Sequence, residues 1–210
     1  MDMLTYADGR LSLMVRGAAA AKSTRRGMLQ PFNPLRIAYS GKGDILNLKQ
    51  IEQQQTYVLP QGKALYSGFY LNELITRLIA TKEPVPHLFD AYSSSIFRLK
   101  QAQELDGILR DFELELLQTL GYGIDLLHEG ESGKEIQANV VYGYELEKGL
   151  VPMPAGSNYL IGGDTLHALA QREPMTRHQN REAKALMRHI LKFYLGDKPL
   201  KSRELFLRKY

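Results

Sequence analysis

The 210-residue sequence contains no cysteine. This absence excludes disulfide bonds, thiolate zinc sites and thiol nucleophiles, and it fits a reducing compartment. The sequence also lacks any apolar run close to the roughly 18 residues of a membrane span. Residues 1–10 alternate and include acids, unlike a signal peptide. We therefore expect a cytoplasmic protein that has no membrane partner.

Acidic residues are scarce near the start of the chain. Residues 9–51 carry eight Lys or Arg but only one acid, Asp44. Residues 104–147 show the opposite, with eleven acids against two bases, and residues 172–210 are basic again. Because a solvated surface usually mixes both signs, this segregation predicts an anionic partner for the two basic segments.

Alternating residues predict a small antiparallel β unit over residues 1–58. In residues 10–16 the apolar side chains occupy every second position, as in a half-buried strand. Residues 35–39 and 45–51 repeat this alternation, and Asp8-Gly9 is a typical hairpin turn. Short strands that close on themselves favour a barrel of the oligonucleotide-binding (OB) type. The aromatic residues Tyr6, Phe32 and Tyr39 are expected in its core.

Beyond residue 60 the apolar residues recur at helical spacing. This periodicity predicts a mainly α-helical domain over residues 59–210, with helices at 64–79, 86–100, 104–120, 164–171 and 176–195. Residues 122–160 are rich in glycine and turns, which predicts an irregular β/turn insert with one hairpin around Glu147-Lys148-Gly149. The expected fold class is therefore α+β, with an N-terminal OB-type barrel followed by a helical domain.

A basic loop over residues 16–32 carries four cations and no acid. Charged loops are more often simply solvated. Here the small residues would let the loop fold around a ligand, and the neighbouring strands also carry Arg and Lys, which favours phosphate binding along a single strand. The residues expected to contact nucleic acid in this part are Arg10, Arg16, Lys22, Arg25, Arg26, Arg36 and Lys42.

A second basic surface is expected on the helix at 176–195. Five cations recur at steps of three or four residues, which places them on one helical face. They are Arg177, Arg181, Lys184, Arg188 and Lys192. Such a stripe can simply be the solvent-exposed face of a helix. Because acids are nearly missing from it, an anionic partner is the alternative explanation, and we include these five residues among the expected DNA contacts.

Motifs for catalysis and cofactor binding are scarce. The turn at 40–43 lacks the ending of a phosphate-binding loop, and Gly-Tyr-Gly at 121–123 lacks the third glycine of a dinucleotide site. The five histidines do not have the spacing of metal ligands. Glu113 and Glu115 lie two apart on a helix and are expected to be surface charges. We therefore expect no enzyme activity, no cofactor and no metal.

Six short motifs, taken in order, resemble the RecO family of bacterial DNA repair proteins over the whole chain. They are Arg16-Gly17-Ala18, Gly27-x-Leu29-Gln30-Pro31-Phe32, Leu65-Tyr66-x-x-x-Tyr70-x-x-Glu73-Leu74, Leu88-Phe89, Leu109-Arg110-x-Phe112-Glu113-x-x-Leu116-Leu117-x-x-Leu120-Gly121-Tyr122, and Lys198-Pro199-Leu200-Lys201-Ser202-Arg203-Glu204-Leu205. Each motif alone is weak, but six at compatible spacing are specific.

The resemblance implies an OB barrel before a helical domain, and a recombination mediator that binds single- and double-stranded DNA. It implies annealing of complementary strands, docking on the C-terminal tail of the single-strand-binding protein, partnership with RecR, and help in loading RecA on gapped DNA. No catalysis is implied. The alternative is a general OB-type nucleic-acid-binding module, such as an RNA-associated protein, which would show the same charge layout but would not bind the tail.

The chain departs from the family pattern in two places. Many relatives carry a cysteine zinc site in the region that here spans residues 128–133, so this chain is expected to hold no zinc. Relatives also begin one strand further upstream. The first barrel strand is therefore expected to be missing, so that either the start codon is misassigned or the barrel is open at one edge.

Arg110 is the only cation of the acidic helix expected at 104–120. It could simply pair with Asp106, four residues earlier. The resemblance implies instead that the helical domain receives an acidic tail with a hydrophobic end, and a planar guanidinium suits a terminal carboxylate. We therefore expect Arg110 to bind the tail together with its apolar neighbours Leu109 and Phe112.

Overall fold

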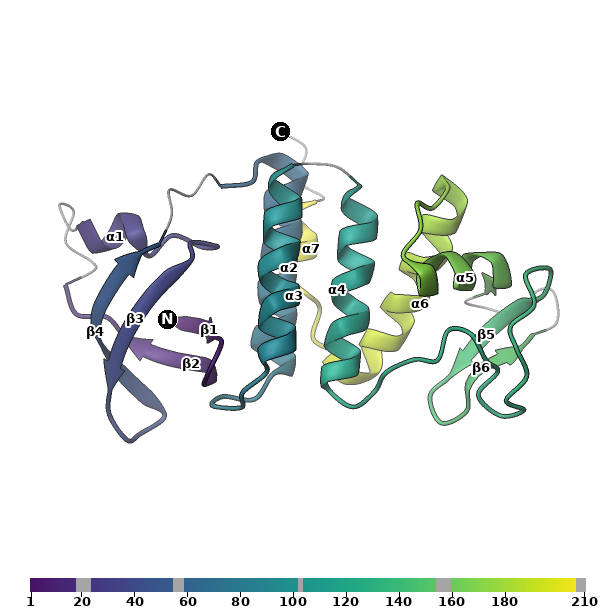
Figure 1. Ribbon diagram of the computed structural model, residues 1–210, viewed down its shortest axis with the longest axis horizontal. Helices are drawn as coiled ribbons and strands as arrows, with labels where there is room; N and C mark the ends of the chain where they lie inside the picture. The colour runs from purple at the N-terminus through teal and green to yellow at the C-terminus, as the bar shows by residue number, and fades with distance from the viewer. Residues whose placement is uncertain (18–23, 55–58, 102–103, 154–159, 207–210) are drawn as a thin grey trace. The chain divides into compact units, whose positions relative to one another are not determined.

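The computed structural model describes residues 1–17, 24–54, 59–101, 104–153 and 160–206. The chain forms two compact units. Unit 1 consists of Met1–Ala102 together with Leu200–Tyr210, and unit 2 consists of Gln103–Pro199. The division expected at residues 58 and 59 stays a prediction. Figure 1 labels the elements of both units.

Unit 1 begins with a four-stranded sheet. Its strands are β1 (Asp2–Thr5), β2 (Gly9–Met14), β3 (Leu35–Ser40) and β4 (Ile45–Gln53), in the order β1-β2-β4-β3. The two hairpins, β1–β2 and β3–β4, are antiparallel, whereas β2 and β4 pair in parallel. The sheet before the helices confirms the expected α+β class. A closed barrel is not detected in the part of the chain that the structure describes.

The core of the sheet is aliphatic. Leu11, Leu13, Leu46 and Leu48 are buried, and Val15 packs against them, as the alternation predicted. Burying one leucine side chain completely in this way stabilises the folded protein by about 1.5–3 kcal/mol. The sheet therefore has one apolar face that is buried. The residues on the outward face of its strands remain available for binding.

The three aromatic residues expected in the core differ in how deeply they are buried. Phe32 is buried, and its ring lies 5.3 Å from that of Phe69. Tyr39 packs against the aliphatic core, and its hydroxyl donates a hydrogen bond to Asp8, which raises the pKa of Tyr39 to about 12. The expectation for Tyr6 is wrong: this side chain is 57% exposed and contacts only the ring edge of Phe89 among the aromatic contacts of the described residues.

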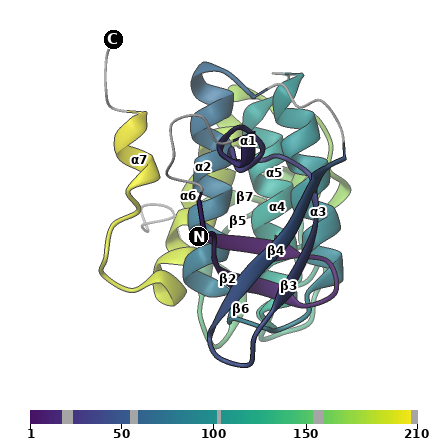
Figure 2. The same cartoon turned by 90° about the vertical axis from the view of Figure 1, so that its left-hand side faces the viewer.

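Four helices complete unit 1. They are α1 (Thr24–Met28), α2 (Gly62–Leu78), α3 (Pro86–Lys100) and α7 (Ser202–Leu205). Helix α1 lies against β4, within the segment that was expected to be a loop (Figure 1). Figure 2 shows the same cartoon turned by 90°, with α1 seen near the top. Helix α3 begins at a proline, whose fixed φ and missing N–H suit the first helical turn.

The sheet is fastened to the turn between α2 and α3. The Arg10 guanidinium donates from Nε to the Ile79 carbonyl at 3.0 Å, and the Lys82 N–H donates to the Arg10 carbonyl at 2.9 Å. Gly9 has a φ of +66° and lies so close that a Cβ atom would overlap the Glu83 carbonyl oxygen. Only glycine satisfies both conditions, so the hairpin turn and its docking depend on the same residue.

Unit 2 combines three helices with a small antiparallel sheet. The helices are α4 (Leu105–Thr119), α5 (Gly163–Gln171) and α6 (Arg177–Leu195), and the strands are β5 (Val141–Glu145), β6 (Gly149–Pro152) and β7 (Ile161–Gly162). The strand order is β6-β5-β7. The expected hairpin is confirmed, and the five expected helices end within two residues of the predicted bounds.

A carboxylate on α2 holds the C-terminal segment of unit 1 in place. Glu73 accepts the backbone N–H groups of Lys201 (2.9 Å) and Ser202 (2.8 Å), at the start of α7. Partial burial alone would raise the pKa of Glu73, but the hydrogen bonds from Ser202 and Lys201 outweigh it and hold this pKa below its ordinary value of 4.5. Tyr66 and Phe206 add an edge-to-face contact at 5.6 Å. Helix α7 is therefore fixed to α2 by both charge and packing.

Candidate nucleic-acid interface

The N-terminal cations are mostly exposed. Arg16, Arg26, Arg36 and Lys42 all point their side chains to solvent around the sheet, as an interface for an anionic partner requires. Lys22 and the side chain of Arg25 lie outside what the structure describes. Arg36 lies on the outward face of β3, Arg16 and Arg26 lie in the 16–32 segment, and Lys42 lies in the turn between β3 and β4.

Arg10 differs from these cations because it is partly buried. Its side chain is 17% exposed, and besides Ile79 it reaches the Asp2 carboxylate at 3.5 Å. Asp2 in turn accepts a 2.6 Å hydrogen bond from the Ser12 hydroxyl. Arg10 thus ties β1, β2 and the end of α2 together, and its expected contact with DNA stays a prediction.

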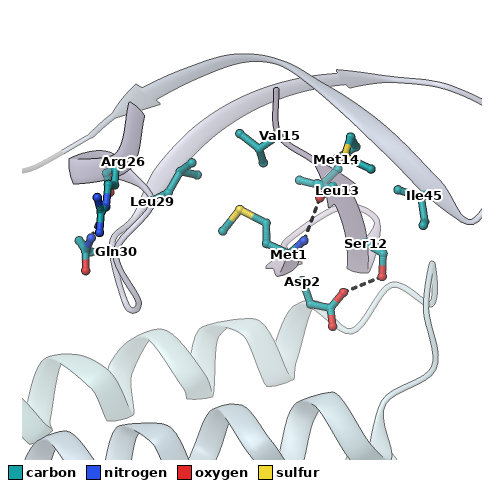
Figure 3. Close-up of a pocket in the computed structure, with 10 residues that line it drawn as sticks. All are labelled: Met1, Asp2, Ser12, Leu13, Met14, Val15, Arg26, Leu29, Gln30 and Ile45. Atoms are coloured by element: carbon teal, nitrogen blue, oxygen red, sulfur yellow. Dashed lines mark hydrogen bonds between the residues drawn. The ribbon is translucent and has the colours of Figure 1, made fainter. Parts of the chain in front are cut away.

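A groove of about 600 Å³ opens between the β1–β2 hairpin and α1 (Figure 3). Its lining is largely apolar with a few polar groups: Met1, Asp2, Ser12, Leu13, Met14, Val15, Arg26, Leu29, Gln30 and Ile45. Arg26 of α1 and Gln30, two residues beyond the end of this helix, lie at one side, and Met14 and Ile45 lie at the other (Figure 3). The sequence did not indicate this groove, because α1 has no helical periodicity by which to predict it.

Helix α6 carries the second basic surface, in unit 2. Its five predicted cations are all exposed. The helix starts with a capping box, in which Thr176 and Gln179 bond reciprocally to each other's backbone N–H. The spacing predicted from the sequence is therefore realised on one continuous helix, and the cations share one of its faces.

Glu182 is the only acidic residue of α6, and its carboxylate binds groups at the start of α5. Its Oε2 atom accepts the Thr165 hydroxyl at 2.5 Å and the Gly162 N–H at 3.3 Å, at the start of α5. The His178 ring lies 3.6 Å from its other oxygen. Glu182 therefore supports α5 rather than neutralising the basic face of its own helix.

The residues expected to bind a protein tail are buried in unit 2. Arg110 is 3% exposed and Phe112 is 1% exposed, while Leu109 is half-buried. The Arg110 guanidinium donates to Glu113 Oε1 at 2.6 Å. The expected surface position of Glu113 is wrong, because this carboxylate is only 1% exposed, and it rather than Asp106 is the ion-pair partner found for Arg110. The expected tail contact stays a prediction.

Metal ligands do not gather anywhere in the described part of the chain: no group of three His, Asp or Glu residues could hold an ion there. At the start of the 128–133 segment, His128 lies 2.9 Å from the carboxylate of Asp125, three residues earlier. Among the described residues no helix is long and apolar enough to cross a membrane.

Two family models match the chain almost from end to end. Residues 1–57 match the model described as Recombination protein O N terminal, and residues 59–204 match that described as Recombination protein O C terminal. Among curated proteins, the DNA repair protein RecO of Vibrio parahaemolyticus is 39% identical over 207 residues, covering 99% of this chain and 85% of that protein.

Further relatives agree. The DNA repair protein RecO of Methylococcus capsulatus is 40% identical over 207 residues, covering 98% of this chain and 85% of the relative. That of Pasteurella multocida is also 40% identical, covering 98% of this chain and 86% of the relative. Two consecutive family models and full-length identity near 40% leave one assignment: the chain belongs to the RecO family of DNA repair and recombination proteins.

Proposed function

We propose that this protein is a DNA-binding recombination mediator that performs no covalent chemistry. It binds single- and double-stranded DNA and anneals complementary strands. With RecR and the single-strand-binding protein it helps to load RecA on gapped DNA in the cytoplasm, at the nucleoid. The observation that carries this proposal is family membership over nearly the whole chain, and the exposed cations of both units support it.

The N-terminal sheet is proposed to be the OB-type DNA-binding part. Its hydrophobic core lies on one face, and Arg16, Arg26, Arg36 and Lys42 remain exposed around it. Lys22 and Arg25 belong to the same proposed contact set. Cations of this kind follow phosphates without reading sequence, so binding should be salt-sensitive and sequence-independent.

The tail of the single-strand-binding protein is proposed to dock in unit 2 near Arg110. A terminal carboxylate would form a two-pronged contact with the guanidinium, Leu109 would supply apolar surface beside it, and the buried Phe112 would contribute only after the site opens. Because Glu113 already contacts Arg110 at 2.6 Å, the tail must compete with a buried carboxylate. The docking site is thus closed until the ion pair rearranges.

Strand annealing tests the whole proposal. Complementary strands coated with single-strand-binding protein should anneal faster when this protein is added, and the acceleration should vanish when the coating protein lacks its tail. A general nucleic-acid-binding module would anneal bare strands and coated strands with no dependence on the tail. Equal annealing rates with and without this protein would contradict the mediator function.

A further inference from the structure

Helix α6 carries an exposed aromatic side chain beside its basic face. Phe193 is 48% exposed, although burying a phenylalanine normally stabilises a protein by about 1.5–3 kcal/mol. It follows Lys192 directly, and it therefore lies about 100° around the helix axis from that cation. The ring therefore lies on a flank of the helix on the side of Lys192, whereas Arg188, five residues earlier, lies about 140° around the axis from it.

The ring of Phe193 is held in place by the helix itself. His189 lies one turn earlier, and the two rings meet edge to face with centroids 5.0 Å apart and an interplanar angle of 83°. An edge-to-face contact orients the phenyl ring before any ligand arrives, which reduces the entropy lost on binding. Phe193 is therefore a fixed and accessible aromatic surface rather than a loose side chain.

The charge around Phe193 is suited to a polyanion. Glu182 is the only acid of α6, and its carboxylate is engaged by Thr165 and Gly162. The five cations of the helix share an exposed face, and Lys192 is the member of that face nearest to the ring. A row of cations along one face, with an aromatic ring on the neighbouring flank, is the combination with which proteins hold single-stranded nucleic acid.

We propose that α6 is a binding site for unpaired nucleotides, in which Phe193 stacks on a base while Lys192 contacts a flanking phosphate and the other cations of the face follow the backbone further along the strand. The inference rests on the proposed DNA binding and adds a preference to it. A duplex keeps its bases stacked inside, so it can use the cations but not the ring. Unit 2 would therefore distinguish single strands from duplex, which cations alone do not.

The test compares three ligands: a thymidine single strand, the same strand with abasic sites, and a duplex of equal length. Phe193→Ala should weaken binding of the thymidine strand by roughly 5- to 20-fold, the lower part of the range for one base–aromatic stack. Its affinity for the abasic strand and the duplex should stay within about twofold, because no phosphate contact is lost. Phe193→Tyr, which keeps the ring, should restore binding of the thymidine strand.

Two controls separate stacking from other effects. Phe97 on α3 in unit 1 is 60% exposed, and Phe97→Ala should change none of the three affinities. Lys192→Gln should weaken all three ligands and reduce the dependence of log K on log salt, whereas Phe193→Ala should leave that dependence unchanged. Unchanged circular dichroism would show that each variant is folded.

The possible outcomes are distinct. If Phe193→Ala weakens all three ligands equally, or none, base stacking by this ring is wrong; the second result is also expected if the flank serves a protein partner instead. If the parent protein binds none of the three ligands, the proposed DNA binding fails and the inference falls with it. The inference is supported only if Phe193→Ala selectively weakens binding of the thymidine strand and Phe193→Tyr restores that binding.

Discussion

At the scale of single residues, Gly9 is the position that tolerates change least. Gly9→Ala should lower the free energy of unfolding by about 2 kcal/mol or more, because alanine disfavours a φ of +66° and its Cβ would overlap the Glu83 carbonyl oxygen. Gly107→Ala is the matched control: Gly107 lies in α4 with open space around it, and the change should be neutral or stabilise the helix by up to about 1 kcal/mol. Denaturant midpoints compare the two. Equal midpoints would contradict the close approach at Gly9.

The buried pair of Arg110 and Glu113 decides how tail binding must be tested. Arg110→Ala would leave a buried carboxylate without this partner and destabilise the fold by about 3–5 kcal/mol, whatever the tail does. Glu113→Gln removes the competing charge and keeps the shape. If Arg110 holds the tail, this variant should bind a tail peptide about 10-fold more tightly.

Glu115→Gln is the control for that experiment, because it makes the same chemical change two residues along α4, at a half-buried position. Peptide titration of both variants gives the comparison. Equal tail affinity of parent, Glu113→Gln and Arg110→Lys would show that the pair only stabilises unit 2.

At the scale of elements, the docking of α7 should depend on pH. The pKa of Glu73 is lowered in the folded protein, so its carboxylate stabilises the fold above the ordinary pKa of 4.5, and this stabilisation is lost as the pH falls through the lowered value. Glu73→Gln should therefore lower the free energy of unfolding by about 1 kcal/mol at neutral pH, with a lower Tm, and this difference should shrink as the pH falls below 4.5 and disappear below the lowered pKa.

Glu52→Gln provides the control, because Glu52 is an exposed carboxylate on β4 of the same unit. It should leave the Tm of the protein unchanged at neutral pH. A Glu73→Gln variant whose Tm deficit is the same at acidic and neutral pH would mean that the charge of Glu73 does not hold α7.

Elements with a local signal were predictable from the sequence, and those without one were not. The alternation that buries Leu11 and Leu13 and the four-residue steps of α6 are both properties of neighbouring residues, so no tertiary information was needed. Strand β7 has only two residues and exists through pairing with β5, where Gly162 opposes Val141. Helix α1 has only five residues, and its glycine and cations give no apolar stripe.

The residues of the candidate site divide in the same way, into those with a local sequence signal and those without one. Exposure of the basic stripe could be predicted because its helix has an apolar face that must turn inward. The burial of Glu113 could not, because two glutamates on one helix resemble ordinary surface charges. Its spacing of three residues from Arg110 was the available signal for an ion pair, and the pattern favoured Asp106 equally well.

At the scale of the whole molecule, both units should contribute to DNA affinity. Each cation that neutralises a phosphate of a single strand adds about −0.7 to the slope of log K against log salt. Neutralising Arg16, Arg26 and Arg36 in unit 1, or Arg181, Lys184 and Arg188 in unit 2, should each flatten the slope by up to about 2. Lys148→Gln is the control, since Lys148 pairs with Glu145 at 3.1 Å. An unchanged slope in either triple variant would remove that unit from the interface.

The division of unit 1 between the two ends of the sequence has a consequence for synthesis. A ribosome releases the strands and α2 early, but it delivers α7 only after all of unit 2 has been made. Until then Glu73 and Tyr66 have no helix to hold, and unit 2, whose residues are contiguous, can fold first as a block. The last segment to emerge therefore completes the first unit begun, so a nascent chain that stops short of residue 200 leaves unit 1 unfinished.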